Sequence, residues 1–127
     1  MTRERIEYIV AEFQKSYRTG EWHARLGIQQ DFKCIYCGQD YLAHYNAYRS
    51  AELDHIIPIS QGGSEGLENV AVCCRTCNQL KLTYYPQGST REEQIADARR
   101  YVTESRLSYE NELAEIREMV RGPSPEL

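Results

Sequence analysis

Four cysteines stand in two pairs, and each pair has the spacing of metal ligands. Cys34 and Cys37 are separated by two residues, as are Cys74 and Cys77. Two such pairs supply the four thiolates of a tetrahedral structural zinc site. A thiol redox function explains one pair but gives the other no role. The spacing therefore predicts a zinc site that joins two distant segments of the chain and contributes on the order of 10 kcal/mol to folding.

A fifth cysteine leaves the choice of one ligand open. Cys73 precedes Cys74 directly, and Cys73 with Cys77 could also bind the metal. We favour Cys74 because it keeps the two-residue spacer of the other pair. Cys73 is then expected to be a buried free thiol.

A second group of reactive residues lies in the stretch LDHIIPISQGG, residues 53–63. Asp54 and His55 stand there just before Pro58 and two glycines, where a strand is expected to end. Histidine ordinarily titrates near pH 6.5, about where it can accept a proton from water. A carboxylate beside it can bind a hard cation. The pair predicts a general base next to a metal ligand, although an isolated pair of this kind is more simply a local hydrogen-bonded pair.

These residues must be positioned by a strand, strand, helix unit. Residues 52–60 and 67–74 have the β-branched and apolar composition of strands, and residues 61–66 form a Gly-rich loop between them. This pattern predicts a hairpin. Residues 75–82 have the composition of a short helix that follows the hairpin directly.

The N-terminal segment predicts one amphipathic helix and then less regular structure. Thr2 is a candidate N-cap and Gly20 a candidate stop. We expect a connector over residues 21–33 and a short helix within residues 42–48. The apolar positions that follow helical spacing are Ile6, Ile9, Val10, Phe13 and Tyr17.

The C-terminal segment predicts a long helix with an apolar stripe. Thr90 and Glu93 form a capping box, and a helix over residues 90–121 would be about 48 Å long. We leave open a break near residues 103–108. Part of the stripe is expected to pack on the N-terminal helix, and a second copy or a partner protein would cover the remainder.

Length and charge restrict the class of protein. A chain of 127 residues fits one domain, and its opening residues lack the apolar run of a signal peptide. We therefore expect a cytoplasmic protein that does not enter the membrane. The net charge of −4 is unfavourable for a protein that grips nucleic acid unaided. Residues 82–127 supply most of it, with 9 acidic and 6 basic side chains.

The full arrangement resembles the HNH endonuclease family over about residues 32–82. Asn69 follows His55 by fourteen residues, and Asn78 follows the second cysteine pair directly. The resemblance implies that His55 is the general base, that Asp54 and Asn78 hold the catalytic metal, and that Asn69 ties the loop between the strands. The pattern here is His-Asn-Asn, whereas the family often has His-Asn-His.

The resemblance also implies the reaction and its cofactors. DNA phosphodiester bonds would be hydrolysed, and oxygen ligands from Asp54 and Asn78 suit Mg²⁺ or Mn²⁺. Arg75 and Lys81 flank Asn78 and are candidate phosphate contacts, although lone surface charges more often have no such role. Zinc would be the structural metal.

We therefore expect an α+β protein with a small zinc-stapled ββα-metal core flanked by N-terminal and C-terminal helices. The expected divisions are an N-terminal helix and connector over 1–31, a nuclease core with the zinc site over 32–85, and a helical arm over 86–127. The alternative is a non-catalytic zinc module that binds protein or nucleic acid. Such a module needs the cysteines but has no use for His55.

Overall fold

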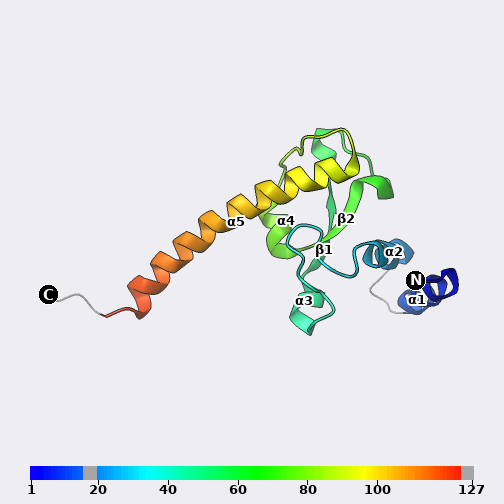
Figure 1. The fold of residues 1–127 in the computed structure, drawn as a ribbon, viewed down its shortest axis with the longest axis horizontal. Coiled ribbons are helices and arrows are strands. Elements are labelled where there is room, and N and C mark those ends of the chain that lie inside the picture. The colour runs from blue at the N-terminus through cyan, green and yellow to red at the C-terminus, as the bar shows by residue number, and fades with distance from the viewer. Residues whose placement is uncertain (16–19, 124–127) are drawn as a thin grey trace.

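The computed structural model describes residues 1–15 and 20–123, and one long helix extends from its small core (Figure 1). The predicted α+β class, with a hairpin and helix between flanking helices, is confirmed. In the described ranges, no helix has the length and apolar content needed to span a membrane. The elements are α1 (Arg3–Lys15), α2 (Glu21–Gln29), α3 (Tyr45–Arg49), β1 (Ala51–His55), the 3-10 helices Ile59–Gln61 and Leu67–Asn69, β2 (Val70–Cys74), α4 (Arg75–Lys81) and α5 (Arg91–Arg121).

Strands β1 and β2 form an antiparallel pair, with Ala51 opposite Cys74 and His55 opposite Val70. Both strands are shorter than the sequence predicted. β1 ends at His55 because the chain approaches Pro58, which cannot donate a ladder hydrogen bond. β2 begins only after the second 3-10 helix.

The hairpin is covered on both faces, so every residue of β2 is buried. Side chains alternate along a strand, and Glu52 and Asp54 therefore share one face of β1 while Leu53 and His55 share the other. The carboxylate face packs against α4, α5 and the loop that carries Cys34. Its buried residues are Cys34, Tyr36, Cys73, Cys74, Cys77, Ala98 and Val102 in one cluster and Ile56, Ala71 and Ile95 in a second. The opposite face contributes to a cluster of Leu26, Tyr41, Ala47, Val70 and Val72.

Helix α1 begins as predicted, since Thr2 Oγ1 accepts a hydrogen bond from Arg5 N at 3.1 Å. The helix is described as far as Lys15. Tyr17, which we counted in the predicted helix, lies outside the described residues. Gly20 was predicted to stop this helix but is the N-cap residue of the next one.

Helix α2 replaces the connector predicted for residues 21–33, so that prediction was wrong. Ala24, Leu26 and Gly27 are buried where the helix packs on the core. A Cβ atom at Gly27 would lie 2.6 Å from a ring carbon of Phe32. Gly27 thus permits close packing of an aromatic ring.

Helix α5 starts at the predicted Thr90 cap, whose Oγ1 accepts a hydrogen bond from Glu93 N at 3.1 Å. The Glu93 carboxylate accepts from Ser89 N at 2.8 Å, one residue before the position of a standard capping box. The first turns of α5 bury Ile95, Ala98 and Val102 against the core.

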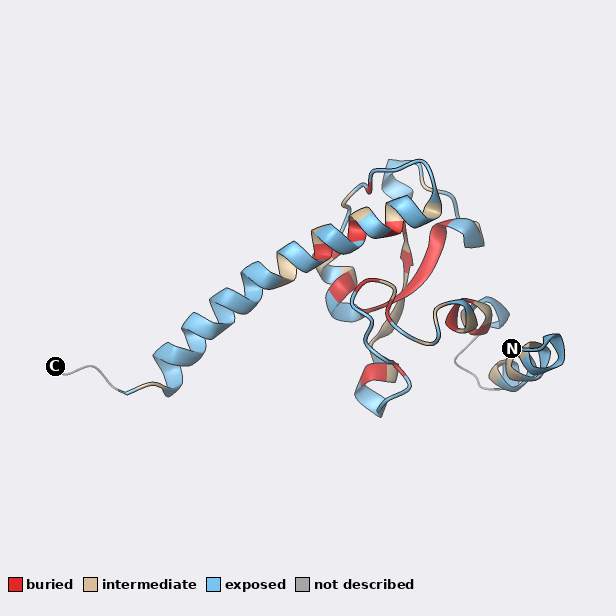
Figure 2. Cartoon of the chain, in the orientation of Figure 1, coloured by how far each residue is buried: buried red, intermediate tan, exposed pale blue. Residues whose placement is uncertain are grey.

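The remainder of α5 leaves the core as a bare helix. It is unbroken from Arg91 to Arg121, about 46 Å at 1.5 Å per residue, so the break considered near residues 103–108 is absent. Every residue from 107 to 121 is exposed, as Figure 2 shows. The expected packing on the N-terminal helix is also wrong, because α5 docks on α4 while α1 lies on the far side of the core (Figure 1).

Asp97 fastens the first turns of α5 to the preceding loop. Its carboxylate accepts hydrogen bonds from Gln87 N at 2.8 Å, the Tyr84 hydroxyl at 2.6 Å and the Arg100 guanidinium at 2.9 Å. These donors lower the pKa of Asp97 to about 2, with the Gln87 amide contributing most.

We expect Asp97→Ala to lower the free energy of unfolding by about 1 kcal/mol, since the carboxylate is partly solvated. The pKa of Asp97 is lower in the folded protein than in the unfolded chain. Its carboxylate therefore contributes its full stabilisation above pH 3.8, the ordinary pKa, and this contribution is lost as the pH falls through about 2. Urea unfolding at several pH values measures the difference in the free energy of unfolding between the parental protein and Asp97→Ala. Glu104→Ala, which removes only an exposed contact with Arg100, is the control. An equal effect of both substitutions would contradict the assignment.

Candidate metal centre and active site

The four paired cysteines converge on one point. The Sγ atoms of Cys34, Cys37, Cys74 and Cys77 all lie within 4.8 Å of one another. Cys37 Sγ and Cys74 Sγ are 3.8 Å apart. Zinc–sulfur bonds of about 2.3 Å in a tetrahedron place the sulfur atoms about 3.8 Å apart. The cluster therefore fits a structural zinc ion.

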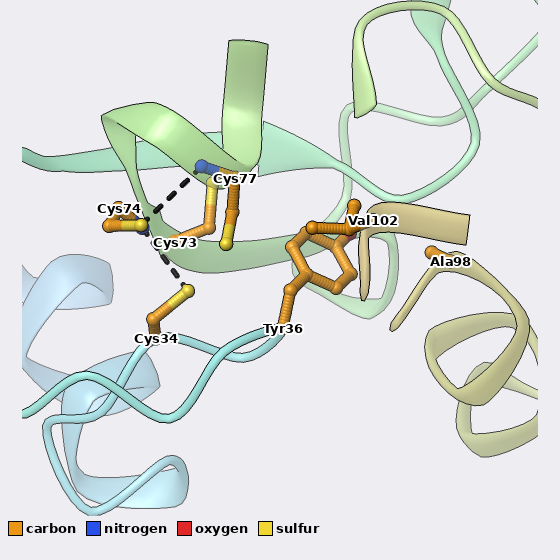
Figure 3. Packing of buried hydrophobic residues seen from close by; sticks show 7 residues of the cluster. All are labelled: Cys34, Tyr36, Cys73, Cys74, Cys77, Ala98 and Val102. Carbon is orange, nitrogen blue, oxygen red and sulfur yellow. Dashed lines mark hydrogen bonds between the residues drawn. The ribbon is translucent and has the colours of Figure 1, made fainter. Parts of the chain in front are cut away.

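Backbone amides support the sulfur atoms in the same way in both pairs. Cys37 N donates to Cys34 Sγ and Cys77 N donates to Cys74 Sγ, each at 3.4 Å. Cys74 N also donates to Cys34 Sγ at 3.3 Å, which links the two segments directly. Figure 3 shows the sulfur atoms of Cys34, Cys74 and Cys77 turned toward one another. Such donors favour the thiolate form that a metal requires.

Of Cys73 and Cys74, the structure places Cys74 in the four-sulfur cluster. Cys73 has no exposed area and is not one of the four clustered residues. Burial raises the pKa of the Cys73 thiol, as expected for a packed, unreactive side chain.

Helix α5 is fastened to the cysteine cluster by two arginines that the sequence analysis did not single out. Arg106 Nη2 donates to Cys77 Sγ at 3.0 Å, and Arg99 Nη2 donates to the Ile35 carbonyl at 2.6 Å. Four thiolates around one zinc ion carry a net charge of about −2, which a guanidinium partly offsets. The sequence signal that could have identified this pair is the seven-residue spacing of Arg99 and Arg106, which places both on one face of the helix.

A row of polar contacts joins β1 to α4. Glu52 accepts hydrogen bonds from Arg75 Nε at 2.7 Å and from Asn78 Nδ2 at 2.8 Å. Asp54 forms an ion pair with Lys81 Nζ at 3.3 Å. Residues spaced three apart share a helix face, and α4 thereby presents Asn78 toward the strand face that carries Asp54.

Asp54 is a buried carboxylate, 6% exposed, at the centre of this interface. The Tyr36 hydroxyl donates to Asp54 Oδ2 at 2.5 Å, and Lys81 is its charged partner. Burial raises the pKa of Asp54, while Lys81 and then Tyr36 act in the opposite direction. A buried carboxylate of this kind is stabilised by any further cation that reaches it.

The expectation that Lys81 is a surface cation is wrong. Its side chain has no exposed area, and Nζ donates to the His55 carbonyl at 3.1 Å as well as contacting Asp54. The ammonium is therefore used inside the protein and holds the end of β1. Arg75 stays at the surface, with 60% of its side chain exposed, although it also pairs with Glu52.

Glu52 is a site residue that the sequence analysis missed. It stands two positions before Asp54, and the period of a strand alone places both carboxylates on one face. Its contacts with Asn78 and then Arg75 lower the pKa of Glu52. Because the Asn78 amide nitrogen faces Glu52, its carbonyl oxygen is directed away from that carboxylate.

Asn69 closes the loop that follows β1. Its Oδ1 accepts from Ile57 N at 2.8 Å, and its Nδ2 donates to the carbonyls of Ile57 at 2.9 Å and Ser64 at 2.8 Å. A Cβ at Gly63 would lie 1.9 Å from the Ile57 oxygen, which explains why glycine is needed beside this amide. Asn69 thus connects the start of the loop after β1 with Ser64 near its far end.

We expect Asn69→Ala to destabilise the protein by about 2–4 kcal/mol, because three partly buried hydrogen bonds to the backbone are lost. Urea unfolding of the zinc-loaded protein measures this change. Asn46→Ala, at an exposed position of α3, is the matched control and should have little effect. A loss of less than about 0.5 kcal/mol for Asn69→Ala would contradict the role given to this side chain.

His55 is half-buried at the last position of β1. It lies on the face opposite Asp54, so the strand does not turn both side chains into one pocket. Because the Cα atoms of neighbouring residues are only about 3.8 Å apart, a phosphate bound at the end of β1 would be within reach of both the His55 and the Asp54 side chains. Lys81 holds the carbonyl of this histidine, and Asn69 holds the backbone two residues after it.

Comparison with known proteins identifies the region that carries these residues. Residues 34–92 match the family model for HNH endonucleases. The match spans the cysteine cluster, the hairpin, α4 and the first residues of α5. Comparisons with curated proteins and with solved structures gave no match.

Proposed function

Residues 34–92 form a domain of the HNH endonuclease family, and from this premise we propose that the protein is a metal-dependent nuclease that hydrolyses phosphodiester bonds in DNA. The observation that carries the proposal is that this one domain holds His55 at the end of β1, a loop tied by Asn69, and Asp54 facing α4. A zinc module that only binds its partners would need the cysteines alone.

The second cation would be held by oxygen atoms at the interface of β1 and α4. Asp54 offers a buried carboxylate and Asn78 offers an amide oxygen, and both are hard ligands that suit Mg²⁺ or Mn²⁺. Glu52 lies next to Asn78 and keeps the amide oriented. When bound, the cation would neutralise charge on the phosphate and on the leaving oxygen.

His55 acts as the general base in this proposal. Its imidazole takes a proton from a water molecule, which attacks phosphorus as the bond to the 3′ oxygen breaks. Lys81 holds the His55 carbonyl, and Asn69 holds the loop after it, so the imidazole is presented by a fixed backbone. The exposed guanidinium of Arg75 is the remaining candidate for contact with a neighbouring phosphate.

Cleavage of labelled duplex DNA, single-stranded DNA and RNA tests the proposal directly. The zinc-loaded chain should cut DNA when Mg²⁺ or Mn²⁺ is added and should not cut when both are omitted; chelators are avoided because they would remove zinc. Asp54→Asn and Asn78→Ala should each slow cleavage and raise the concentration of Mg²⁺ or Mn²⁺ needed for half-maximal activity. Binding of nucleic acid without cleavage under every metal condition would favour the non-catalytic module and overturn the proposal.

We also infer that the exposed part of α5, residues 107–121, is an assembly surface for a second copy or a partner protein. Its exposed apolar residues extend well beyond the core, whereas its acidic side chains would repel phosphate. The large exposed side chains there are Leu107, Tyr109, Leu113, Ile116, Met119 and Val120.

Light scattering should show a mass above the 14.8 kDa of one chain as the protein concentration is raised. Exchanging Leu113 and Ile116 together for glutamate should return the mass to that of the monomer, because both side chains are exposed on the part of α5 that lies beyond the core. Glutamate at the exposed position Gln79 of α4 serves as the control. A monomer at all concentrations, with no partner found, would contradict self-assembly through α5.

A further inference from the structure

A pocket of about 460 Å³ opens beside His55, on the hairpin face opposite Asp54. Its volume lies in the range of sites that bind small organic groups. Its walls come from α2, both strands and the loop between them, so distant segments of the chain build it together. The lining residues are Trp22, Leu53, His55, Glu65, Leu67 and Val70.

Two large apolar side chains in this pocket remain open to solvent. Trp22 is 41% exposed and Leu67 is 48% exposed. Trp22 belongs to α2, which lies outside the region matched by the nuclease family. The solvent-exposed indole of Trp22 lies in the same pocket as the proposed general base. A flat ring can stack on such an indole.

The helix that carries Trp22 is fixed firmly to the hairpin. Gln30, directly after α2, donates from Nε2 to the Val72 carbonyl and accepts at Oε1 from Val72 N, both at 2.8 Å. One side chain thus satisfies both backbone groups of a residue in β2. Leu26 of α2 is buried in the same cluster as Val72. The backbone that carries the indole is therefore held in place before a ligand arrives, which reduces the entropy lost when a ligand stacks on it.

We propose that this pocket receives an unstacked nucleobase of the DNA strand being cut, with Trp22 as the stacking partner. The inference rests on the proposed nuclease function, because His55 places the pocket next to the phosphate under attack. A nucleobase has flat apolar faces that can pack against the apolar walls of the pocket. Glu65 can accept a hydrogen bond from the exocyclic amine of a base but would repel a phosphate. A base inside an intact duplex cannot enter, so the preferred substrate has unpaired bases at the cut.

Trp22 is the only tryptophan of the chain, so its fluorescence reports on this pocket alone. The full zinc-loaded protein, with Mg²⁺ and Mn²⁺ omitted, is titrated with a single-stranded oligonucleotide and with the same strand carrying abasic positions. The base-bearing strand should quench the fluorescence strongly and the abasic strand should not. Equal quenching by both strands would overturn the proposal.

Cleavage kinetics provide the second measurement. Trp22→Ala should raise KM for single-stranded DNA by about 5- to 100-fold, with little change in kcat, while Trp22→Phe should keep most of the affinity. Leu67→Ala tests the opposite wall without touching α2 and should also raise KM. Tyr8→Ala, at an exposed aromatic of α1, is the matched control.

The two proposals fail in different ways. Absence of cleavage by the unmodified chain on every substrate overturns the nuclease function. Normal cleavage together with an unchanged KM in both Trp22→Ala and Leu67→Ala overturns the pocket assignment alone. A duplex cut as efficiently as a single strand would also count against the nucleobase pocket.

Discussion

Replacing His55 with alanine is expected to slow DNA cleavage by a factor of about 10² to 10⁴, the usual contribution of a general base. The imidazole ends a strand and is only half-buried, so its removal leaves a modest gap in the packing. The contacts that fix this part of the chain use the His55 carbonyl and the Asn69 side chain, and both survive the substitution. The loss should therefore appear in kcat with the zinc content and the fold retained.

Single-turnover cleavage with saturating Mg²⁺ measures this loss, and circular dichroism with zinc analysis checks the fold. His44→Asn is the control, because His44 only caps α3 through its Nδ1 and asparagine is also a good cap. Cleavage by His55→Ala at the parental rate would assign the base to another residue. A His55→Ala protein that loses zinc would show that the histidine is structural instead.

Replacing Cys34 with serine is expected to unfold the region between the cysteine pairs. Cys34 Sγ accepts amide hydrogen bonds from both Cys37 and Cys74, so its loss breaks the link between the two pairs as well as one metal bond. Binding of structural zinc contributes on the order of 10 kcal/mol, comparable with the 5–15 kcal/mol that stabilises a typical domain. The hairpin and the first turns of α5 pack around this cluster and should become disordered with it.

Zinc content per chain and thermal unfolding measure the effect of Cys34→Ser. Cys73→Ala is the matched control, because it removes a buried thiol of β2 that does not belong to the four-sulfur cluster. It should keep one zinc ion per chain and lose only the modest stability expected of a small core truncation. A Cys34→Ser protein that melts at the parental temperature would exclude a metal-stapled core.

The elements that could be predicted from the sequence are those with strong local signals. Cysteine spacing gave the four-sulfur cluster, and turn residues between apolar runs gave the hairpin. The cap at Thr90 was visible in the order of residues alone. Each of these features depends on residues only a few positions apart or on a pattern that few other structures require.

The features that could not be predicted depend on contacts between distant segments. Helix α2 contains Gly27, and only the ring of Phe32 against it shows why a glycine belongs there. Lysine is usually a surface residue, and Lys81 is buried because it forms an ion pair with Asp54 of β1, a distant segment. The length of α5 was predicted, but its docking on α4 depends on which surface the folded core offers.

Tyr36 joins two sites that would otherwise be independent. It lies between Cys34 and Cys37, and its hydroxyl donates to Asp54 at 2.5 Å. Zinc bound at the sulfur atoms would order this loop, and the loop would in turn orient the carboxylate that is proposed to bind the second cation. Such a link is thermodynamically reciprocal: zinc occupancy should strengthen cation affinity at Asp54 by the same factor by which the cation strengthens zinc retention. Tyr36→Phe, which keeps the packing and removes the hydroxyl, should uncouple the two affinities, so that zinc is lost at the same rate with and without Mg²⁺.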